Sequence, residues 1–182
     1  MGRPKQLLPL QGKPVIRHCL DTVLKAGIGQ VIVVLGYKGE EIANAITDLP
    51  VSTVFNRAPQ SDMAASVRVG LRALSRDPSG IFVCLSDHPL VQAATLRTLA
   101  RRHRSHPDNI IIPEHRGKRG HPTLFPAAVI NEVFSGATLR DLQRRNPSSV
   151  SVITVDDPGV VLDMDTMEDY RKIRIAAGET AG

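Results

Sequence analysis

Residues 1–37, MGRPKQLLPLQGKPVIRHCLDTVLKAGIGQVIVVLGY, place a predicted helix directly before a predicted buried strand. Pro14 suits the first turn of a helix, and apolar side chains then recur every three or four residues until Gly27. The run VIVVL at 31–35 is purely aliphatic, which is typical of a parallel strand covered on both faces. This stretch therefore predicts one helix–strand unit of an α/β sheet.

The same alternation continues downstream of this unit. Two further apolar runs, VSTVF at 51–55 and IFVCL at 81–85, predict buried strands. Helical patterns cover residues 40–46, 63–74 and 92–103, and Asp62 is a candidate N-cap for the second of these. This order predicts a Rossmann-like, doubly wound α/β domain with a mostly parallel sheet, in which a first strand before Lys5 is missing.

The last third of the chain follows a different pattern. It predicts a strand at 110–112, a basic and Gly-rich loop at 114–122, two short helices after Pro126, a strand at 150–155 and a final helix from about Asp165 to Ala176. A length of 182 residues suits one core and is short for two. We therefore expect residues 1–182 to form a single domain.

The net charge of +5 fits either nucleic acid or a small polyanionic ligand. The basic residues gather in two helical runs, one with Arg101, Arg102 and Arg104 and one with Arg140, Arg144 and Arg145. Neither run contains the aromatic side chains on which single-stranded bases stack. We interpret both runs as solvated helix faces and expect no nucleic-acid partner.

The cysteines and the lengths of the apolar runs indicate the cellular compartment of the protein. Cys19 and Cys84 lie far apart in apolar segments without a C-x-x-C pair, which predicts buried, reduced thiols in a cytoplasmic protein. The first residues contain no apolar core of a signal peptide, and the run at 31–35 is far too short to cross a bilayer. No membrane partner is expected.

Candidate ligands for a metal follow two predicted strands. Asp87 comes just after the strand at 81–85, at the sheet edge where ligands bind in open α/β folds, although it could also cap the helix at 92–103. Asp163 and Asp165 alternate with apolar residues in VVLDMDTMEDY, at 160–170, and the same segment makes a good helix start. Two carboxylates from separate strand ends suit Mg²⁺, which takes its remaining ligands from water and phosphate.

Basic residues could complete such a site. Lys5 is a candidate contact for phosphates, although a lone lysine near a terminus is usually solvated. The loop RGKRGHPTLF, at 116–125, combines glycines with three cationic side chains, but a plain exposed hairpin turn would look similar. The scattered Cys84, His88 and His121 have no zinc-site spacing.

With these segments in view, the sequence resembles the molybdopterin nucleotidyltransferase-like family, most closely its molybdenum cofactor cytidylyltransferase branch. The resemblance covers nearly the whole chain. It rests on the four segments MGRPKQLLPLQGKPVI, SDHPLV, RGHPTLF and LDMDTMEDY in this order and spacing. The family begins with a strand and a Leu-Ala-Ala-Gly-x-Ser-x-Arg-Met-Gly nucleotide loop, and this chain begins at the closing Met-Gly. A start codon placed too late, a degraded gene product and a form completed by a partner each explain that difference, and we favour the first.

The resemblance implies roles for particular residues. Gly2, Lys5, Asn56 and Ser66 would bind the nucleotide, Lys5 and Asp87 would be catalytic, Asp87 and Asp165 would bind Mg²⁺ with Asp163 in reserve, and Gly120, His121 and Pro122 would face the acceptor. Two positions depart from the family pattern. Asp62 stands where the family usually has Gly, and His88 stands where it usually has Gln.

The implied reaction is transfer of CMP from CTP to the phosphate of molybdopterin or its molybdenum-loaded form, with release of pyrophosphate. GTP in place of CTP is the nearest alternative. A non-catalytic ligand-binding module is a second alternative, because most of the nucleotide loop is absent. A molybdoenzyme or its chaperone is the macromolecular partner that the resemblance suggests.

Overall fold

The computed structural model describes residues 4–58, 62–145 and 147–179. Its sheet strands are β3 (Ile32–Leu35), β4 (Ser52–Phe55), β5 (Gly80–Val83), β6 (Ile110–His115), β7 (Lys118–Arg119), β8 (Thr123–Pro126) and β9 (Val150–Thr154), and β1 (Pro9–Leu10) with β2 (Lys13–Pro14) forms a small hairpin. The helices are α1 (Val15–Lys25), α2 (Gly39–Ala45), α3 (Met63–Arg72), α4 (Ala93–Ser105), α5 (Ala127–Ile130), α6 (Leu139–Arg145) and α7 (Met167–Ala176). Short 3-10 turns are η1 (Lys5–Leu7), η2 (Asn131–Ser135), η3 (Pro147–Ser149) and η4 (Pro158–Val161). All predicted helices and strands are present, with boundaries shifted by at most three residues. The expectation that the strand at 51–55 is buried was wrong, because most residues of β4 are exposed.

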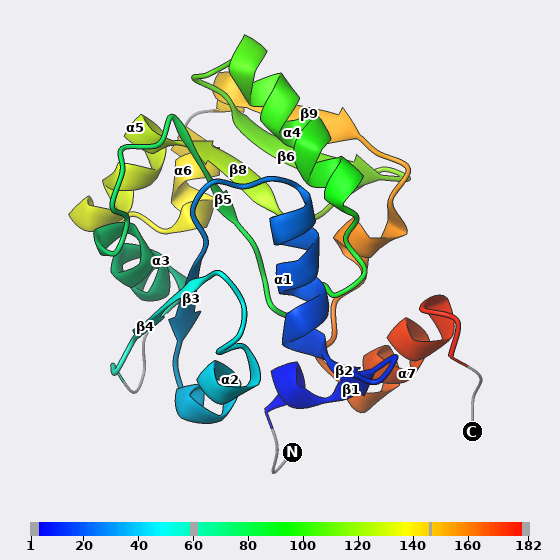
Figure 1. The fold of residues 1–182 in the computed structure, drawn as a ribbon. Helices are drawn as coiled ribbons and strands as arrows, with labels where there is room; N and C mark the ends of the chain where they lie inside the picture. Colours follow the sequence, from blue (N-terminus) through cyan, green and yellow to red (C-terminus); the bar gives the residue numbers. More distant parts are fainter. Residues whose placement is uncertain (1–3, 59–61, 146, 180–182) are drawn as a thin grey trace.

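The larger strands form two sheets (Figure 1). β3 and β4 pair in parallel, from Ile32 opposite Ser52 to Leu35 opposite Phe55. The second sheet has the order β5-β8-β6-β7, with β9 parallel to β6 and the other neighbours antiparallel. Within the described residues no strand joins β3 to β5. The α/β class is therefore confirmed: β3–β4 and β6–β9 pair in parallel, and β7 and β8 add antiparallel neighbours within the described residues.

The mixed sheet arises from a hairpin that the loop prediction missed. Arg116 and Gly117, with φ of 50° and 80°, form the turn between β6 and β7, and positive φ at both central residues is typical of a tight two-residue hairpin turn. The chain then returns as β8 between β5 and β6, antiparallel to both. Part of the predicted loop at 114–122 is thus strand.

β6 lies at the centre of the core because its alternate side chains pack on both faces of the sheet. Ile111 packs with Leu99 of α4 and Leu124 of β8 on one face. Ile110 and Ile112 belong to the cluster on the other face, together with Phe125, Ile130, Val133 and Leu142. The continuous apolar run therefore buries both faces of this strand, as expected for a covered sheet.

A separate apolar cluster joins the two ends of the described chain. Leu10 and Val15 pack against Met164, Tyr170 and Ile173, and the hydroxyl of Tyr170 donates a hydrogen bond to the carbonyl of Pro9. Figure 1 shows the β1–β2 hairpin beside α7. This cluster brings the segment around Lys5 to the segment around Asp165, although they are far apart in sequence.

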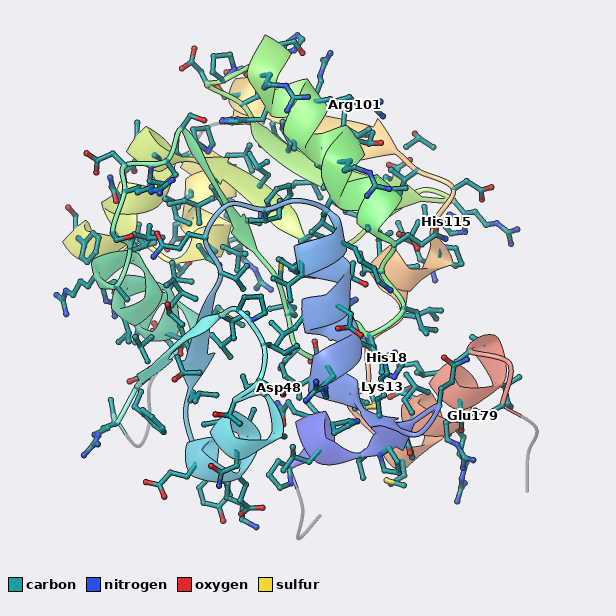
Figure 2. The ribbon with its side chains drawn as sticks, in the orientation of Figure 1. Lys13, His18, Asp48, Arg101, His115 and Glu179 are labelled. Atoms are coloured by element: carbon teal, nitrogen blue, oxygen red, sulfur yellow. The ribbon has the colours of Figure 1, made fainter. Side chains whose placement is uncertain are left out.

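The structure tests two expectations, one about the basic helix faces and one about the cysteines. Arg101 is exposed on the outer face of α4 (Figure 2), and Arg104, Arg140, Arg144 and Arg145 are exposed as well, as predicted for solvated helix faces. Arg102 differs, because it is only partly exposed and its Nε is buried without a hydrogen-bond partner among the described residues. Cys19 and Cys84 are free thiols, and residue 84 as a whole is exposed. Burial nevertheless raises the pKa of both thiols to about 12, which agrees with the expected buried thiols. In the part of the chain that the structure describes, no helix has the length and apolarity to span a membrane.

Gly159 lies where η4 packs closely against the turn that follows β5. A Cβ atom at Gly159 would lie 2.3 Å from the carbonyl oxygen of Leu90 and 2.6 Å from the backbone nitrogen of Val91. Neither backbone atom can move aside cheaply, so we expect Gly159→Ala to lower the free energy of unfolding by about 1–3 kcal/mol in urea denaturation. Gly29→Ala is the matched control, because a Cβ there meets no atom within 4 Å. Equal denaturation midpoints for the two variants would contradict this packing.

Candidate functional site

The described site is built around the Lys5 ammonium group. Lys5 Nζ lies 2.8 Å from Oδ2 of Asp87 and 2.9 Å from Oδ1 of Asp165, and it donates a hydrogen bond to each. The three side chains come from η1, from the turn after β5 and from the segment before α7. The structure therefore brings together three residues that the sequence predicted separately.

The position of Lys5 is fixed by its neighbours in η1. Leu7 is buried with Ile16, Leu20 and Leu35, and the backbone amide of Leu8 donates to the carbonyl of Lys5. Next to this contact, Gln6 Nε2 donates to Oγ of Ser86 at 3.3 Å. The η1 turn is thus attached to the turn that carries Asp87 through two consecutive side chains.

Lys5 carries a positive charge at neutral pH. Burial lowers the pKa of Lys5, but the hydrogen bonds and negative charges of Asp87 and Asp165 outweigh it and raise the pKa above the ordinary 10.5. The ammonium group therefore remains a cation between two carboxylates.

Asp87 does not cap α4. That role belongs to Asp157, which is only 2% exposed and accepts hydrogen bonds from the backbone amide of Gln92 at 2.8 Å and from the hydroxyl of Thr95 at 2.6 Å. Asp87 Oδ2 faces Lys5, while its Oδ1 is buried without a hydrogen-bond partner among the described residues. A buried carboxylate oxygen without a partner is costly, so this atom is available to a ligand.

Asp165, and not Asp163, contacts Lys5. The start of α7 uses other residues, because Thr166 and Asp169 form a reciprocal capping box. Glu168 pairs with Lys172 at 2.8 Å. The side chain of Asp165 is thus free of the capping role that its neighbours fulfil.

The donor set fits a divalent cation that keeps part of its water shell. Among the described residues no group of three or more His, Cys, Asp or Glu side chains is arranged to hold a metal ion. Two carboxylates within reach of one cation, one of them with an unpartnered oxygen, instead suit Mg²⁺, which usually binds one or two carboxylates and takes further ligands from water and substrate phosphates.

The predicted acceptor-side loop packs beside Asp87. Gly120 is buried, and a Cβ atom there would lie 2.1 Å from the carbonyl oxygen of Val160. The backbone amide of His121 donates to the same carbonyl at 2.8 Å. Glycine at position 120 is therefore required by close backbone packing against η4.

Two imidazole rings connect this loop to Asp87. The ring centroids of His88 and His121 lie 5.3 Å apart, and Nε2 of His88 lies 3.9 Å from Oδ1 of Asp87. Burial lowers the pKa of His121, and the neighbouring His88 lowers it further, so the ring is neutral at pH 7. His88, which departs from the family pattern, thus stands between Asp87 and His121.

Asn56 and Ser66 form a second pair. Nδ2 of Asn56 donates to Oγ of Ser66 at 3.1 Å, which joins the end of β4 to the first turn of α3. Asp62 caps this helix by accepting from the backbone amide of Ala65 at 2.7 Å, which gives its carboxylate a structural role at the position where the related pattern has Gly. Gly2 lies outside the described residues.

Comparison with known proteins identifies the family of this chain. The model of the MobA-like NTP transferase domain matches residues 1–150. The chain belongs to the MobA-like NTP transferase domain family. It is accordingly a nucleotidyltransferase-family protein, which confirms the resemblance at this level.

Individual relatives are similar in sequence, and two solved structures are also similar in fold. The chain is 29% identical to nicotine blue oxidoreductase of Paenarthrobacter nicotinovorans, over 95% of this chain and 89% of that protein. The crystal structure of Rv0371c from Mycobacterium tuberculosis H37Rv has a TM-score of 0.82 at 29% identity, covering 96% of this chain and 90% of that one, and the same protein has been solved in complex with manganese. A nucleotidyl transferase from Methanothermobacter thermautotrophicus has a TM-score of 0.80 at 25% identity, covering 95% and 84%.

Sequence reasoning missed Asp157 in this MobA-like domain. Its carboxylate also accepts from the backbone amide of Gly159 at 3.0 Å, so a single buried side chain joins η4 to the start of α4. The run Asp157-Pro158-Gly159 is a turn signal that indicates the local bond. The bonds to Gln92 and Thr95 arise only from the tertiary fold.

Removing the Asp157 carboxylate tests this link. We expect Asp157→Ala to lower the free energy of unfolding by about 1–3 kcal/mol, because three donors, two of them on the buried residues Thr95 and Gly159, lose their acceptor. Asp156→Ala is the matched control, since Asp156 is exposed, and we expect a change within about 0.5 kcal/mol. Urea denaturation followed by circular dichroism measures both, and similar losses for the two variants would argue against the proposed role.

Proposed function

We propose that this MobA-like protein transfers CMP from CTP to the phosphate of molybdopterin or its molybdenum-loaded form. The observation that carries the proposal is the meeting of Lys5 with Asp87 and Asp165. One cationic and two anionic side chains at the edge of an α/β sheet suit a triphosphate and a divalent cation. The Gly120–Pro122 loop beside Asp87 supports an acceptor site next to the nucleotide.

In the proposed reaction, an oxygen of the acceptor phosphate attacks the α-phosphorus of CTP. A bond forms between that oxygen and the α-phosphorus, and the bond from the α-phosphorus to the bridging oxygen breaks, releasing pyrophosphate. The nucleophile is already an anion, so the protein needs to position the two substrates and neutralise charge, and no general base is required.

Each group of residues has a part in that positioning. Lys5 would contact the triphosphate, Gly2, Asn56 and Ser66 would bind the nucleotide, and Gly120, His121 and Pro122 would face the acceptor. Asp87 and Asp165 would hold Mg²⁺, which orients phosphates and neutralises negative charge when bound. The structure of Rv0371c with manganese supports a divalent cation in this family.

Pyrophosphate release tests the role of Asp87. With CTP, Mg²⁺ and acceptor, we expect Asp87→Ala to reduce the rate by about 10²-fold or more, because a charge-stabilising group at the reacting phosphates is lost. Asp163→Asn is the comparison, since Asp165 and not Asp163 contacts Lys5, and we expect it to stay close to the unaltered protein. Full turnover by Asp87→Ala would overturn the assignment.

Donor choice is tested by competition. With labelled CTP and GTP at equal concentration, we expect the cytidylyl product to dominate, as the resemblance of the acceptor-side loop to the cytidylyl-transferring branch implies. A dominant guanylyl product would assign the protein to the GTP-dependent relatives. No turnover with either donor, together with no thermal stabilisation by either nucleotide, would support the non-catalytic module instead.

A further inference from the structure

The ammonium group of Lys5 lies between the two carboxylates that the proposed function assigns to the metal. It contacts one oxygen of each, at 2.8 Å and 2.9 Å. A divalent cation bound by the same two side chains would occupy the same region. The two cations also repel each other at contact distance, so they compete for one position.

We propose that Lys5 acts as a built-in counter-ion of the Asp87–Asp165 pair, which a triphosphate must draw away before a divalent cation binds tightly. The proposal rests on the proposed function and concerns the order and coupling of its ligands. In the absence of nucleotide the Lys5 ammonium group pairs with the two carboxylates, and when nucleotide is bound it pairs with the triphosphate. Metal and nucleotide then bind cooperatively.

The construction of η1 permits this exchange without movement of the backbone. The amide of Leu7 donates to the carbonyl of Pro4 and the amide of Leu8 to that of Lys5, and the side chain of Leu7 is buried. The side chain of Lys5 is 25% exposed and carries its charge on a flexible four-carbon stem. The ammonium group can therefore change partners by rotating about side-chain bonds alone.

The environment of Asp87 makes the two events interdependent. Its side chain is only 19% exposed, and Oδ1 is buried without a hydrogen-bond partner among the described residues. If Lys5 left alone, Asp87 would become a largely buried charge without a counter-ion, which is strongly unfavourable. A metal that arrives as Lys5 departs removes this cost, and by linkage each ligand then increases affinity for the other.

Binding of Mn²⁺ alone, without nucleotide, tests the proposal. Free Mn²⁺ is measured by electron paramagnetic resonance in titrations of the unaltered protein, Lys5→Gln and Lys5→Arg. We expect Lys5→Gln to bind Mn²⁺ at least about fivefold more tightly, the lower end of typical coupling between sites. Lys5→Arg keeps the positive charge and should bind as weakly as the unaltered protein. Lys5→Met replaces Lys5→Gln if the latter does not fold.

Lys13→Gln controls for the general loss of a positive charge in the same segment. Lys13 pairs with Asp21 at 3.2 Å through a largely exposed side chain (Figure 2), and we expect its replacement to leave Mn²⁺ affinity unchanged. Asp87→Asn should abolish tight binding in the Lys5→Gln background. Equal or weaker Mn²⁺ binding by Lys5→Gln, with binding still lost in Asp87→Asn, would overturn the counter-ion role and leave the metal site standing. Unchanged binding in Asp87→Asn would instead remove the metal site, and the proposed function with it.

Discussion

The ion pairs of Lys5 with Asp87 and Asp165 require three distant segments to meet: η1, the turn after β5 and the segment before α7. Asp87 is separated from Lys5 by 82 residues and Asp165 by 160. Bringing such distant segments together costs chain entropy, which other contacts between these segments must offset. The apolar cluster of Leu10 and Val15 with Met164, Tyr170 and Ile173 supplies that stabilisation, because burial of large side chains is the dominant favourable term in folding.

A second set of contacts holds the acceptor-side loop and α4 in place around η4. Asp157 bonds to the start of α4, and the close approaches of Gly120 to Val160 and of Gly159 to Leu90 leave no room for side chains. These contacts involve backbone atoms and one buried carboxylate, so they tolerate little displacement. The turn with Asp87 and the loop with His121 are therefore positioned by the same rigid turn, which suits a site that must align two substrates.

Local patterns predicted most of the elements because their causes are local. The three apolar runs at 31–35, 51–55 and 81–85 correspond to β3, β4 and β5. The spacing of apolar side chains in α1 matches its buried residues Val15, Ile16, Leu20 and Val23. β8 was missed because TLFP is short and follows a Gly- and Pro-containing turn, so that only its pairing between β5 and β6 defines it as a strand. The antiparallel pairing of β8 was missed for the same reason, since strand direction at this point is set by the hairpin at Arg116 and Gly117.

The residues of the site, too, were predicted in part from local sequence and in part only from the tertiary fold. Residue type and strand-end position made Asp87 and Asp165 candidates, but they left open whether Asp87 capped α4 and whether Asp163 or Asp165 was the second carboxylate of the metal site. Both questions concern competing hydrogen bonds, and only the fold shows that Asp157 and the Thr166–Asp169 box fulfil the capping roles. Once the caps are filled by other residues, the unpartnered oxygen of Asp87 has no structural explanation in the described part of the chain. Proteins retain such costly groups mainly where function requires them, so this single atom argues for a ligand at Asp87 more strongly than the sequence position of the residue does.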